Sequence, residues 1–498
     1  MRYQRLWLRW LLLLLVVPCL ALRMREPPPP IPVSRVTPDE RWLRVKLNQF
    51  VASDTRTFLM RFYYNDEFAE ENAVITIGGE WEISSGWAMG GLAYDIAKQL
   101  RAGMFYTEHR YYGKTRPFDN TRLSSLQYLS VHQALADLAQ FIHYIKSDAF
   151  EGGQYKSGRV VVVGCSYAGS MATWMRQTYP HLVDAAFSDS GPVLAQEAYP
   201  EYMTIVIKAI RERGGEACLD SISEGMKQLV KMLATIAKAK ELSKMFNTCT
   251  PVQSSPPQDM TAFLEKIEDS FNELVQKSKN IPAACAVLTN ASVSSPVRRL
   301  ANYITSWSSK PCVDIRYTGR APDYMNTSYD SENYAARLWM YQTCVEFGWY
   351  PISTSAHEPY FPRVPLEYYL QHCKDYFSED FNEEQLRRGV QQTNIMFGGL
   401  KHRPDHLISV SGTHDPWSAL APNSSHARRN SPVYVIPGVA HCKAIRGPEN
   451  GDSRELRNAR RVVVNFMHNN IHRPIPLSDA TYIQVTPVLL GLALVVLY

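Results

Sequence analysis

The stretch Arg159-Val-Val-Val-Val-Gly-Cys-Ser-Tyr-Ala-Gly169 decides the fold of this chain. Its four consecutive valines are typical of a strand buried on both faces, as at the centre of a parallel sheet. Helical spacing follows up to Pro180, so the segment from Gly164 predicts a tight turn from strand to helix. A serine on such a turn carries its hydroxyl above the sheet. The G-x-S-x-G pattern is common and Ala168 replaces its second glycine, yet the flanking strand and helix favour Ser166 as a nucleophile over an ordinary turn.

The regions on both sides of this stretch alternate between strands and helices. The predicted strands span 57–64, 73–77, 104–107, 185–188, 407–411 and 433–436. The predicted helices between and after them span 90–101, 127–146 and 456–469. This alternation predicts an α/β fold, with a parallel sheet covered by helices on both faces. Because 195–398 contains helical runs and little that resembles a strand, we predict a sheet domain over 45–194 and 399–475 that is interrupted by an inserted helical cap over 195–398.

Length and charge narrow the possible functions. A chain of 498 residues is long for one compact core, which agrees with a sheet domain plus an insertion. With 45% hydrophobic and 20% charged residues, the composition is that of a globular protein. Leaving out the three arginines of the first ten residues reduces the net charge from +5 to +2. This excess is too small to predict binding to nucleic acid or to an anionic membrane surface.

The N-terminus and the cysteines predict the secretory pathway. Residues 1–21 combine a basic start, a short apolar run and small residues at the end, as in a signal peptide, and a proline-rich spacer follows over 22–44. Eight cysteines remain after cleavage, and most should be paired in an oxidising compartment. Cys165, on a buried turn beside the nucleophile, is expected to be a free thiol, and no cysteine or histidine spacing predicts a metal site. Three glycosylation sequons agree with secretion: Asn290, Asn326 and Asn423.

Two further side chains occupy the positions that a serine nucleophile requires. A serine hydroxyl needs a histidine base, and that histidine needs a carboxylate to orient it. In the order typical of α/β-hydrolases, the acid and the histidine each follow a later strand. Asp415 follows the strand over 407–411, and His441 follows the strand over 433–436. We therefore predict the triad Ser166, Asp415 and His441, and we keep His414 only as a rival base.

The stabilisation of an oxyanion requires two N–H donors. The amide of Tyr167, next to the nucleophile, is the first candidate, and the amide of Gly79, after the strand over 73–77, is the second. Glu80 lies at the rim of the same site, where a carboxylate can receive the amino terminus of a peptide. The alternative interpretation of Glu80 is an ordinary solvated acid or salt-bridge partner.

Several motifs resemble a known family of serine exopeptidases. They are Gly78-Gly-Glu80, Glu108-His-Arg-Tyr-Tyr-Gly113, Gly164-Cys-Ser-Tyr-Ala-Gly169, Tyr341-Gln-Thr-Cys-Val-Glu-Phe-Gly348, Asp415-Pro-Trp417 and Ala440-His-Cys442. Over roughly 45–470 the chain resembles the family of lysosomal Pro-Xaa carboxypeptidase, dipeptidyl peptidase II and thymus-specific serine protease, and it resembles the last branch most. The resemblance implies an α/β-hydrolase core with a helical cap and exopeptidase action, often after proline, with no cofactor.

The resemblance also assigns individual residues. By similarity, Ser166 is the nucleophile, Asp415 the orienting acid and His441 the base, while Trp417 belongs to the substrate-binding residues. It further implies a disulfide bond between the cysteines at 344 and 373, that is, Cys344–Cys373. The chain departs from the family pattern around the nucleophile, where a cysteine and an alanine replace two small glycines, and again over 82–85, after the Gly-Gly-Glu motif.

The C-terminal tail and the overall function leave alternatives open. The apolar run that ends the segment 476–498 resembles a glycolipid-anchor signal, and a packed tail or a membrane span are the alternatives. We expect a serine exopeptidase, extracellular or lysosomal, that removes short peptides from a chain terminus, in prolyl-type or dipeptidyl fashion. The rivals are a binding protein on a hydrolase fold whose catalysis has lapsed, and a carboxylesterase. A homodimer that forms through the cap is possible.

Overall fold

The structure is a computed structural model that describes residues 26–278, 280–307, 311–353, 360–361 and 364–471. The expected signal peptide and the apolar tail beyond residue 475 lie outside the described residues. Within the part that is described, no helix is both long and apolar enough to cross a membrane.

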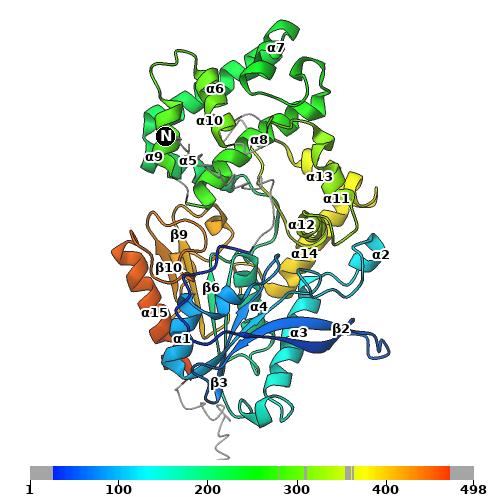
Figure 1. Ribbon diagram of the computed structural model, residues 1–498, viewed down its shortest axis with the longest axis vertical. Coiled ribbons are helices and arrows are strands. Elements are labelled where there is room, and N and C mark those ends of the chain that lie inside the picture. Colours follow the sequence, from blue (N-terminus) through cyan, green and yellow to red (C-terminus); the bar gives the residue numbers. More distant parts are fainter. Residues whose placement is uncertain (1–25, 279, 308–310, 354–359, 362–363, 472–498) are drawn as a thin grey trace, which may run out of the picture.

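One eight-stranded sheet forms the centre of the molecule (Figure 1). The strands follow the order β1-β2-β4-β3-β5-β6-β9-β10; β1 and β2 are antiparallel to their neighbours and the other pairs are parallel. This order, in which β2 runs opposite to the other strands of the sheet, is that of the α/β-hydrolase fold. The strands are β1 Asp39–Lys46, β2 Thr57–Asn65, β3 Asn72–Ile77, β4 Ala102–Thr107, β5 Val160–Cys165, β6 Ala185–Asp189, β9 Leu407–Gly412 and β10 Val433–Ile436. β1 begins inside the stretch expected to be a spacer, so the sheet reaches further toward the N-terminus than the sequence indicated.

The valines of β5 are buried because helices cover both faces of the sheet. Val160 and Val162 pack in one core with α3 (Val131–Ile145) and α4 (Tyr167–Thr178). Val161 and Val163 pack in a second core with α1 (Gly91–Leu100) and α15 (Arg454–Ile471). Alternate side chains of one strand point to opposite faces, so a continuous apolar run fits a sheet with two cores.

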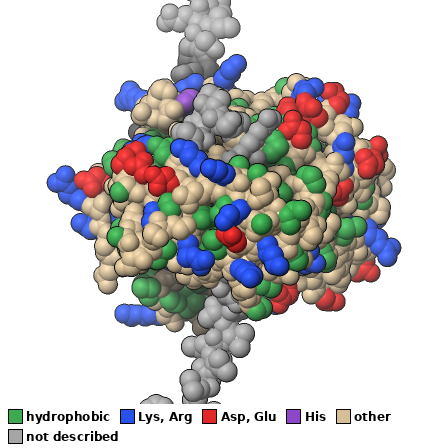
Figure 2. All heavy atoms as spheres, turned by 90° about the horizontal axis from the view of Figure 1, so that it is seen from above, with side chains coloured by type: hydrophobic (Ala, Val, Ile, Leu, Met, Phe, Trp, Pro, Cys, Tyr) green, Lys and Arg blue, Asp and Glu red, His purple; other side chains and the backbone are tan. Residues whose placement is uncertain are grey.

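A helical segment separates β6 from β9 and lies above the carboxyl end of the sheet (Figure 1). Within this segment, two short strands, β7 (Gln196–Ala198) and β8 (Gly348–Tyr350), pair in parallel. Seen from above, acidic and basic side chains are interspersed on this cap (Figure 2). Its helices are α5 Glu201–Gly214, α6 Glu216–Leu233, α7 Ile236–Met245, α8 Pro257–Gln276, α9 Ile281–Leu288, α10 Pro296–Trp307, α11 Ala321–Met325, α12 Tyr334–Gln342, α13 Leu366–Tyr376 and α14 Glu383–Phe397.

Candidate active site

The turn that carries Ser166 has the backbone shape of a nucleophile elbow. Ser166 follows β5 directly with φ 57° and ψ −131°, and a positive φ is costly for a residue other than glycine. A Cβ atom at Gly164 would lie 2.1 Å from the carbonyl oxygen of Ala168, so only glycine fits there. The amide of Ser166 donates to the carbonyl of Asp189, the last residue of β6, at 3.0 Å. The turn therefore holds Ser166 at the carboxyl edge of the sheet, where its side chain is partly exposed.

Asp415 and His441 come together above the ends of β9 and β10. His441 Nδ1 lies 2.7 Å from Asp415 Oδ1, and the Trp417 amide donates to the same oxygen at 3.1 Å. Asp415 is fully buried, so its contact with the imidazole is shielded from water. His441 Nε2 is also buried, and it has no hydrogen-bond partner among the described residues. Among the described residues, no hydrogen bond joins His441 Nε2 to Ser166. Of the three predicted triad residues, the structure therefore joins Asp415 and His441 directly.

A disulfide bond links the loops that carry Ser166 and His441. Cys165 and Cys442 are bonded, with 5.7 Å between their Cα atoms, although they are 277 residues apart in the chain. The expectation that Cys165 is a free thiol is therefore wrong. That expectation considered only the neighbours of Cys165 in sequence, whereas its partner comes from the far end of the chain. The described disulfide bonds are Cys165–Cys442, Cys218–Cys285, Cys249–Cys312 and Cys344–Cys373, the last as the family resemblance implied.

Three buried carboxyl groups influence the charge of His441. Burial alone would lower the pKa of His441, but the charge and hydrogen bond of Asp415, with smaller contributions from Asp189 and Glu80, raise it above its usual value. Burial raises the pKa of Glu80 to about 7 and that of Asp189 to about 6. Glu80 Oε2 is buried and has no hydrogen-bond partner in the part of the chain that the structure describes. The interpretation of Glu80 as an ordinary solvated acid does not fit a side chain that is 7% exposed.

His414, the rival base, points away from this group. Its Nε2 lies 2.6 Å from Glu212 Oε2 on cap helix α5, and the hydrogen bond from His414 lowers the pKa of Glu212. Adjacent residues at the end of a strand point in different directions. His414 therefore contacts the cap, whereas Asp415 contacts His441.

Comparison with known proteins identifies the family. A family model described as serine carboxypeptidase S28 matches residues 45–463, which is most of the chain. The chain belongs to the serine carboxypeptidase S28 family. It is 31% identical over 451 residues to the putative serine protease K12H4.7 of Caenorhabditis elegans, covering 86% of this chain and 87% of that protein. It is 28% identical over 448 residues to the mouse thymus-specific serine protease (86% of each chain), and 26% identical over 395 residues to the mouse lysosomal Pro-X carboxypeptidase (75% and 77%). The S28 chain is thus a serine-type peptidase.

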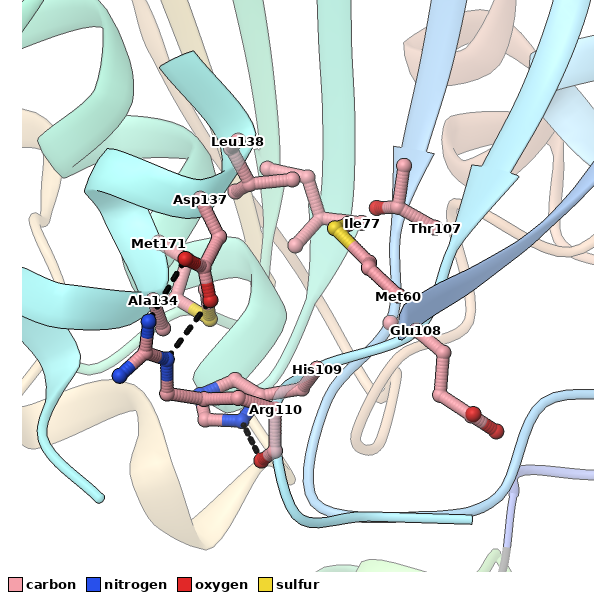
Figure 3. Close-up of a pocket in the computed structure, with 11 residues that line it drawn as sticks. Met60, Ile77, Thr107, Glu108, His109, Arg110, Ala134, Asp137, Leu138 and Met171 are labelled. Atoms are coloured by element: carbon pink, nitrogen blue, oxygen red, sulfur yellow. Dashed lines mark hydrogen bonds and ion pairs between the residues drawn. The ribbon is translucent and has the colours of Figure 1, made fainter. Parts of the chain in front are cut away.

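The Glu108–Gly113 motif of this S28 chain makes buried contacts next to the turn that carries Ser166. Glu108 pairs with Arg61 at 2.6 Å, and a Cβ at Gly113 would clash with the Glu108 carboxylate. Arg110 binds both oxygens of Asp137 at 2.6 Å (Figure 3). The cavity in Figure 3 has a volume of about 10 Å³, room for about one water molecule. Neither Ser166 nor His441 lines it, so substrate does not bind there.

A directed chain of hydrogen bonds connects the motif, the elbow and the cap. Burial lowers the pKa of His109 to about 3, so its ring is neutral. Its Nδ1 donates to the carbonyl of Arg110 at 2.8 Å, which leaves Nε2 to accept from the Tyr167 hydroxyl at 3.1 Å. The Tyr167 hydroxyl also accepts from Gln342 Nε2 at 3.2 Å, and Gln342 Oε1 accepts from Tyr112 at 2.7 Å. The residue after the nucleophile is thereby fixed by both the core and cap helix α12.

The two predicted oxyanion donors lie on turns of restricted shape. Tyr167 is the first residue of α4, so its amide is one of the N–H groups that the helix leaves without an internal partner. Gly79 follows β3, and a Cβ there would lie 2.6 Å from the ring of Trp81, so a larger residue would require that ring to move. Both turns are at the carboxyl end of parallel strands, β5 and β3.

Trp417 forms part of an aromatic wall beside His441. Its ring centre lies 6.4 Å from that of His441, 6.0 Å from Trp349 and 5.6 Å from Tyr202 on cap helix α5. Trp417 is partly exposed, and its Nε1 is buried without a hydrogen-bond partner among the described residues. This wall joins the sheet domain to the cap and offers an apolar surface next to the imidazole.

Other predicted sites lie away from this centre. The sequon asparagines Asn290, Asn326 and Asn423 are all exposed. Across the described ranges, no group of three histidine, cysteine or acidic side chains could hold a metal ion.

Sequence reasoning missed three residues that shape the site. Asp189 could have been found, because it is the last residue of β6, the strand after the nucleophile helix, and lies at the edge where site residues gather. Cys442 and Gln342 stood inside motifs that carried the family resemblance, but nothing local indicated what they contact.

Proposed function

We propose that this S28 chain is a serine exopeptidase in which Ser166, Asp415 and His441 form a catalytic triad that works through an acyl-enzyme intermediate. The observation that carries the proposal is the 2.7 Å contact between His441 and Asp415, on a loop bonded through Cys442 to the residue before Ser166. Membership of a serine peptidase family supports the same reaction type.

The proposed steps use groups already described. His441 Nε2, which is without a hydrogen-bond partner among the described residues, accepts the proton of Ser166 as Oγ attacks the scissile carbonyl. Asp415 keeps Nδ1 protonated and stabilises the imidazolium. The amides of Tyr167 and Gly79 hold the oxyanion. His441 then gives its proton to the leaving amine, and the same nitrogen activates the water that hydrolyses the acyl-enzyme.

The burial of Glu80 indicates that the site binds the amino terminus of a peptide. Glu80 Oε2 has no hydrogen-bond partner among the described residues, and such a buried carboxylate oxygen gains most from binding an ammonium group and repels the carboxylate of a chain end. Because Glu80 acts on His441 electrostatically, the terminus would lie close to the scissile bond. We therefore propose removal of short units, such as dipeptides, from the amino terminus, with Trp417 contacting a ring or apolar side chain of the substrate.

The compartment follows from the covalent chemistry. Disulfide bonds form and persist in oxidising environments, and the described residues contain four of them together with three exposed sequons. One relative is named a lysosomal Pro-X carboxypeptidase. We propose that the protein is a glycoprotein of the secretory pathway, extracellular or lysosomal.

A fluorophosphonate probe tests the triad, because it reacts only with an activated serine. The wild-type protein should be labelled at Ser166, identified by mass spectrometry of the tryptic peptide, and Ser166→Ala should not be labelled. Heat-denatured wild type is the control for nonspecific reaction. A folded wild-type protein that is not labelled would contradict the peptidase proposal and favour a binding protein.

Replacing Glu80 with glutamine tests the terminus that is attacked. We expect KM for peptides with a free amino terminus to rise roughly 10- to 100-fold, as expected for loss of a charged partner in a buried site. Peptides with an acetylated amino terminus should be poor substrates of the wild type, and the Glu80→Gln substitution should not raise KM for these peptides further. The assay is product mass spectrometry on peptides with free or blocked ends.

Glu82→Gln is the matched control for this experiment. Glu82 lies two residues further along the same turn, but its side chain is 51% exposed and pairs with Arg61. Its neutralisation should change KM less than threefold. Equal effects of the two substitutions, or products released only from the carboxyl terminus, would refute the role given to Glu80.

A further inference from the structure

The Cys165–Cys442 bond differs in position from the other described disulfide bonds. It joins the residue before Ser166 to the residue after His441, whereas the other three lie within the cap segment between β6 and β9. Its cysteines are 277 residues apart, against 67 or fewer for the others. It is therefore the bond, of those described, that connects two proposed catalytic elements.

The sheet order explains why such a connection matters. β5 carries Ser166, and β10 precedes His441, but β6 and β9 lie between these strands. Three strand spacings separate β5 from β10, roughly 14 Å at about 4.8 Å each. The chain after Ile436 must therefore cross back over the ends of two strands before His441 reaches the elbow. A loop that leaves its own strand in this way needs an anchor at its far end.

Hydrogen bonds hold this loop to α1 and α15, through Leu92 and Arg460, and two further hydrogen bonds hold it at the end of β6. The Cys442 amide donates to Ser190 Oγ at 3.0 Å, and the Ile445 amide donates to Asp189 Oδ2 at 2.7 Å. The elbow has its own contact with the same segment, from the Ser166 amide to the Asp189 carbonyl. These bonds bring both loops to β6, but the disulfide joins the loop to the elbow itself. Both cysteines are buried, so the bond is shielded from solvent.

We propose that the Cys165–Cys442 disulfide is a positioning pair that fixes the distance between Ser166 Oγ and His441 Nε2. This inference rests on the proposed function, since it presumes that these two atoms exchange a proton. Proton transfer is sensitive to distance, and a displacement of about 1 Å can lower a rate about 100-fold. Substrate contacts at Glu80 and Trp417 do not involve the disulfide. Opening the disulfide bond should therefore lower the rate of the chemical step and leave the affinity for substrate largely unchanged.

The test compares two pairs of substitutions. Cys165→Ala with Cys442→Ala removes the positioning pair, and Cys218→Ala with Cys285→Ala removes a bond of equally buried cysteines between α6 and α9 of the cap. The readout is the pseudo-first-order rate constant of labelling by the fluorophosphonate probe, which does not depend on the amount of folded enzyme. We expect it to fall roughly 10- to 100-fold in the first variant and less than threefold in the second. In peptide assays, the first variant should lose kcat with KM within threefold of wild type.

The outcomes separate this inference from the proposed function. If wild type is not labelled at Ser166, the proposed function fails. If wild type is labelled and the first variant reacts as fast as the second, the positioning role is refuted, even if both variants melt at lower temperature. Should the first variant not fold, wild type is reduced stepwise with a phosphine, alkylated and analysed by mass spectrometry. The labelling rate must then fall with the opening of Cys165–Cys442, and a fall that follows another bond would overturn the proposal.

Discussion

Replacing His441 with glutamine is expected to lower kcat about 10⁴- to 10⁶-fold while the protein remains folded. Glutamine can still donate a hydrogen bond to the buried Asp415 carboxylate, so the loop retains a contact there. It has no basic nitrogen in place of Nε2, so the Ser166 proton has no acceptor. Steady-state hydrolysis of a free peptide measures the loss, and circular dichroism with thermal melting verifies the fold.

His414→Gln is the matched control, since it removes a histidine one residue from Asp415. His414 contacts Glu212 of the cap rather than the proposed catalytic groups. We expect its kcat to remain within threefold of wild type. If His414→Gln is as inactive as His441→Gln, the assignment of the base is wrong.

The pH profile of the wild-type enzyme provides a second check on His441. Only the neutral imidazole can accept a proton, and burial, which would favour that form, is outweighed by Asp415 and by the smaller effects of Asp189 and Glu80. The pKa of His441 is therefore raised above 6.5. It follows that kcat/KM should rise with pH through a value above 6.5, and that activity should be lost as pH falls below it. A rate that stays constant from pH 8 to pH 5 would contradict this account.

Replacing Arg110 with methionine should destabilise the protein by about 3–5 kcal/mol. Arg110 is fully buried and donates from Nε and Nη2 to both oxygens of Asp137, each at 2.6 Å (Figure 3). Its Nη1 donates to the carbonyls of Leu47 and Tyr128, at 3.0 and 2.9 Å. Methionine fills a similar volume but leaves the Asp137 carboxylate buried without a cation. Urea or thermal unfolding measures the change in the free energy of unfolding.

The double variant Arg110→Met with Asp137→Leu isolates the cause of that loss. When both charges are removed together, no unpaired carboxylate remains, so most of the lost stability should return. A double variant as unstable as Arg110→Met would show that packing or the two carbonyl contacts, rather than the ion pair, dominate. Either variant should leave the site chemistry intact in its folded fraction, because, among the described residues, the hydrogen bonds of the Arg110 guanidinium go to Asp137 and to the carbonyls of residues 46, 47 and 128 rather than to Ser166 or His441.

The sequence predicted the α/β fold because its strongest signals are local. The valines of β5 are apolar on both faces, and β9 and β10 end three and five residues before Asp415 and His441. In a parallel sheet all carboxyl ends lie at one edge, so strand order along the chain is enough to gather these residues. The contact between Asp415 and His441 could be anticipated in this way without any knowledge of the cap.

Features that depend on distant partners could not be predicted. Cys165 has no local sign of its bond to Cys442, because the pairing depends on how far the loop after β10 crosses the sheet. The place of Asp189 at the end of β6 could be found from the sequence, but its contacts with Ile445 and Ser166 depend on two other loops. β1 was not predicted, because it is an edge strand with alternating exposure and because the prolines before it indicated a spacer over 22–44.

The position of the cap segment has a consequence for how the chain is made. β6 ends at Asp189, and its neighbour in the sheet, β9, begins at Leu407. On the ribosome, β6 therefore emerges long before the strand that covers its open side. Until then it offers unpaired backbone groups to any other extended chain. Such long-range pairing is slow and leaves partly folded chains prone to aggregate. A nascent chain that stops before residue 407 therefore carries the serine turn on an incomplete sheet whose open edge can pair with other chains.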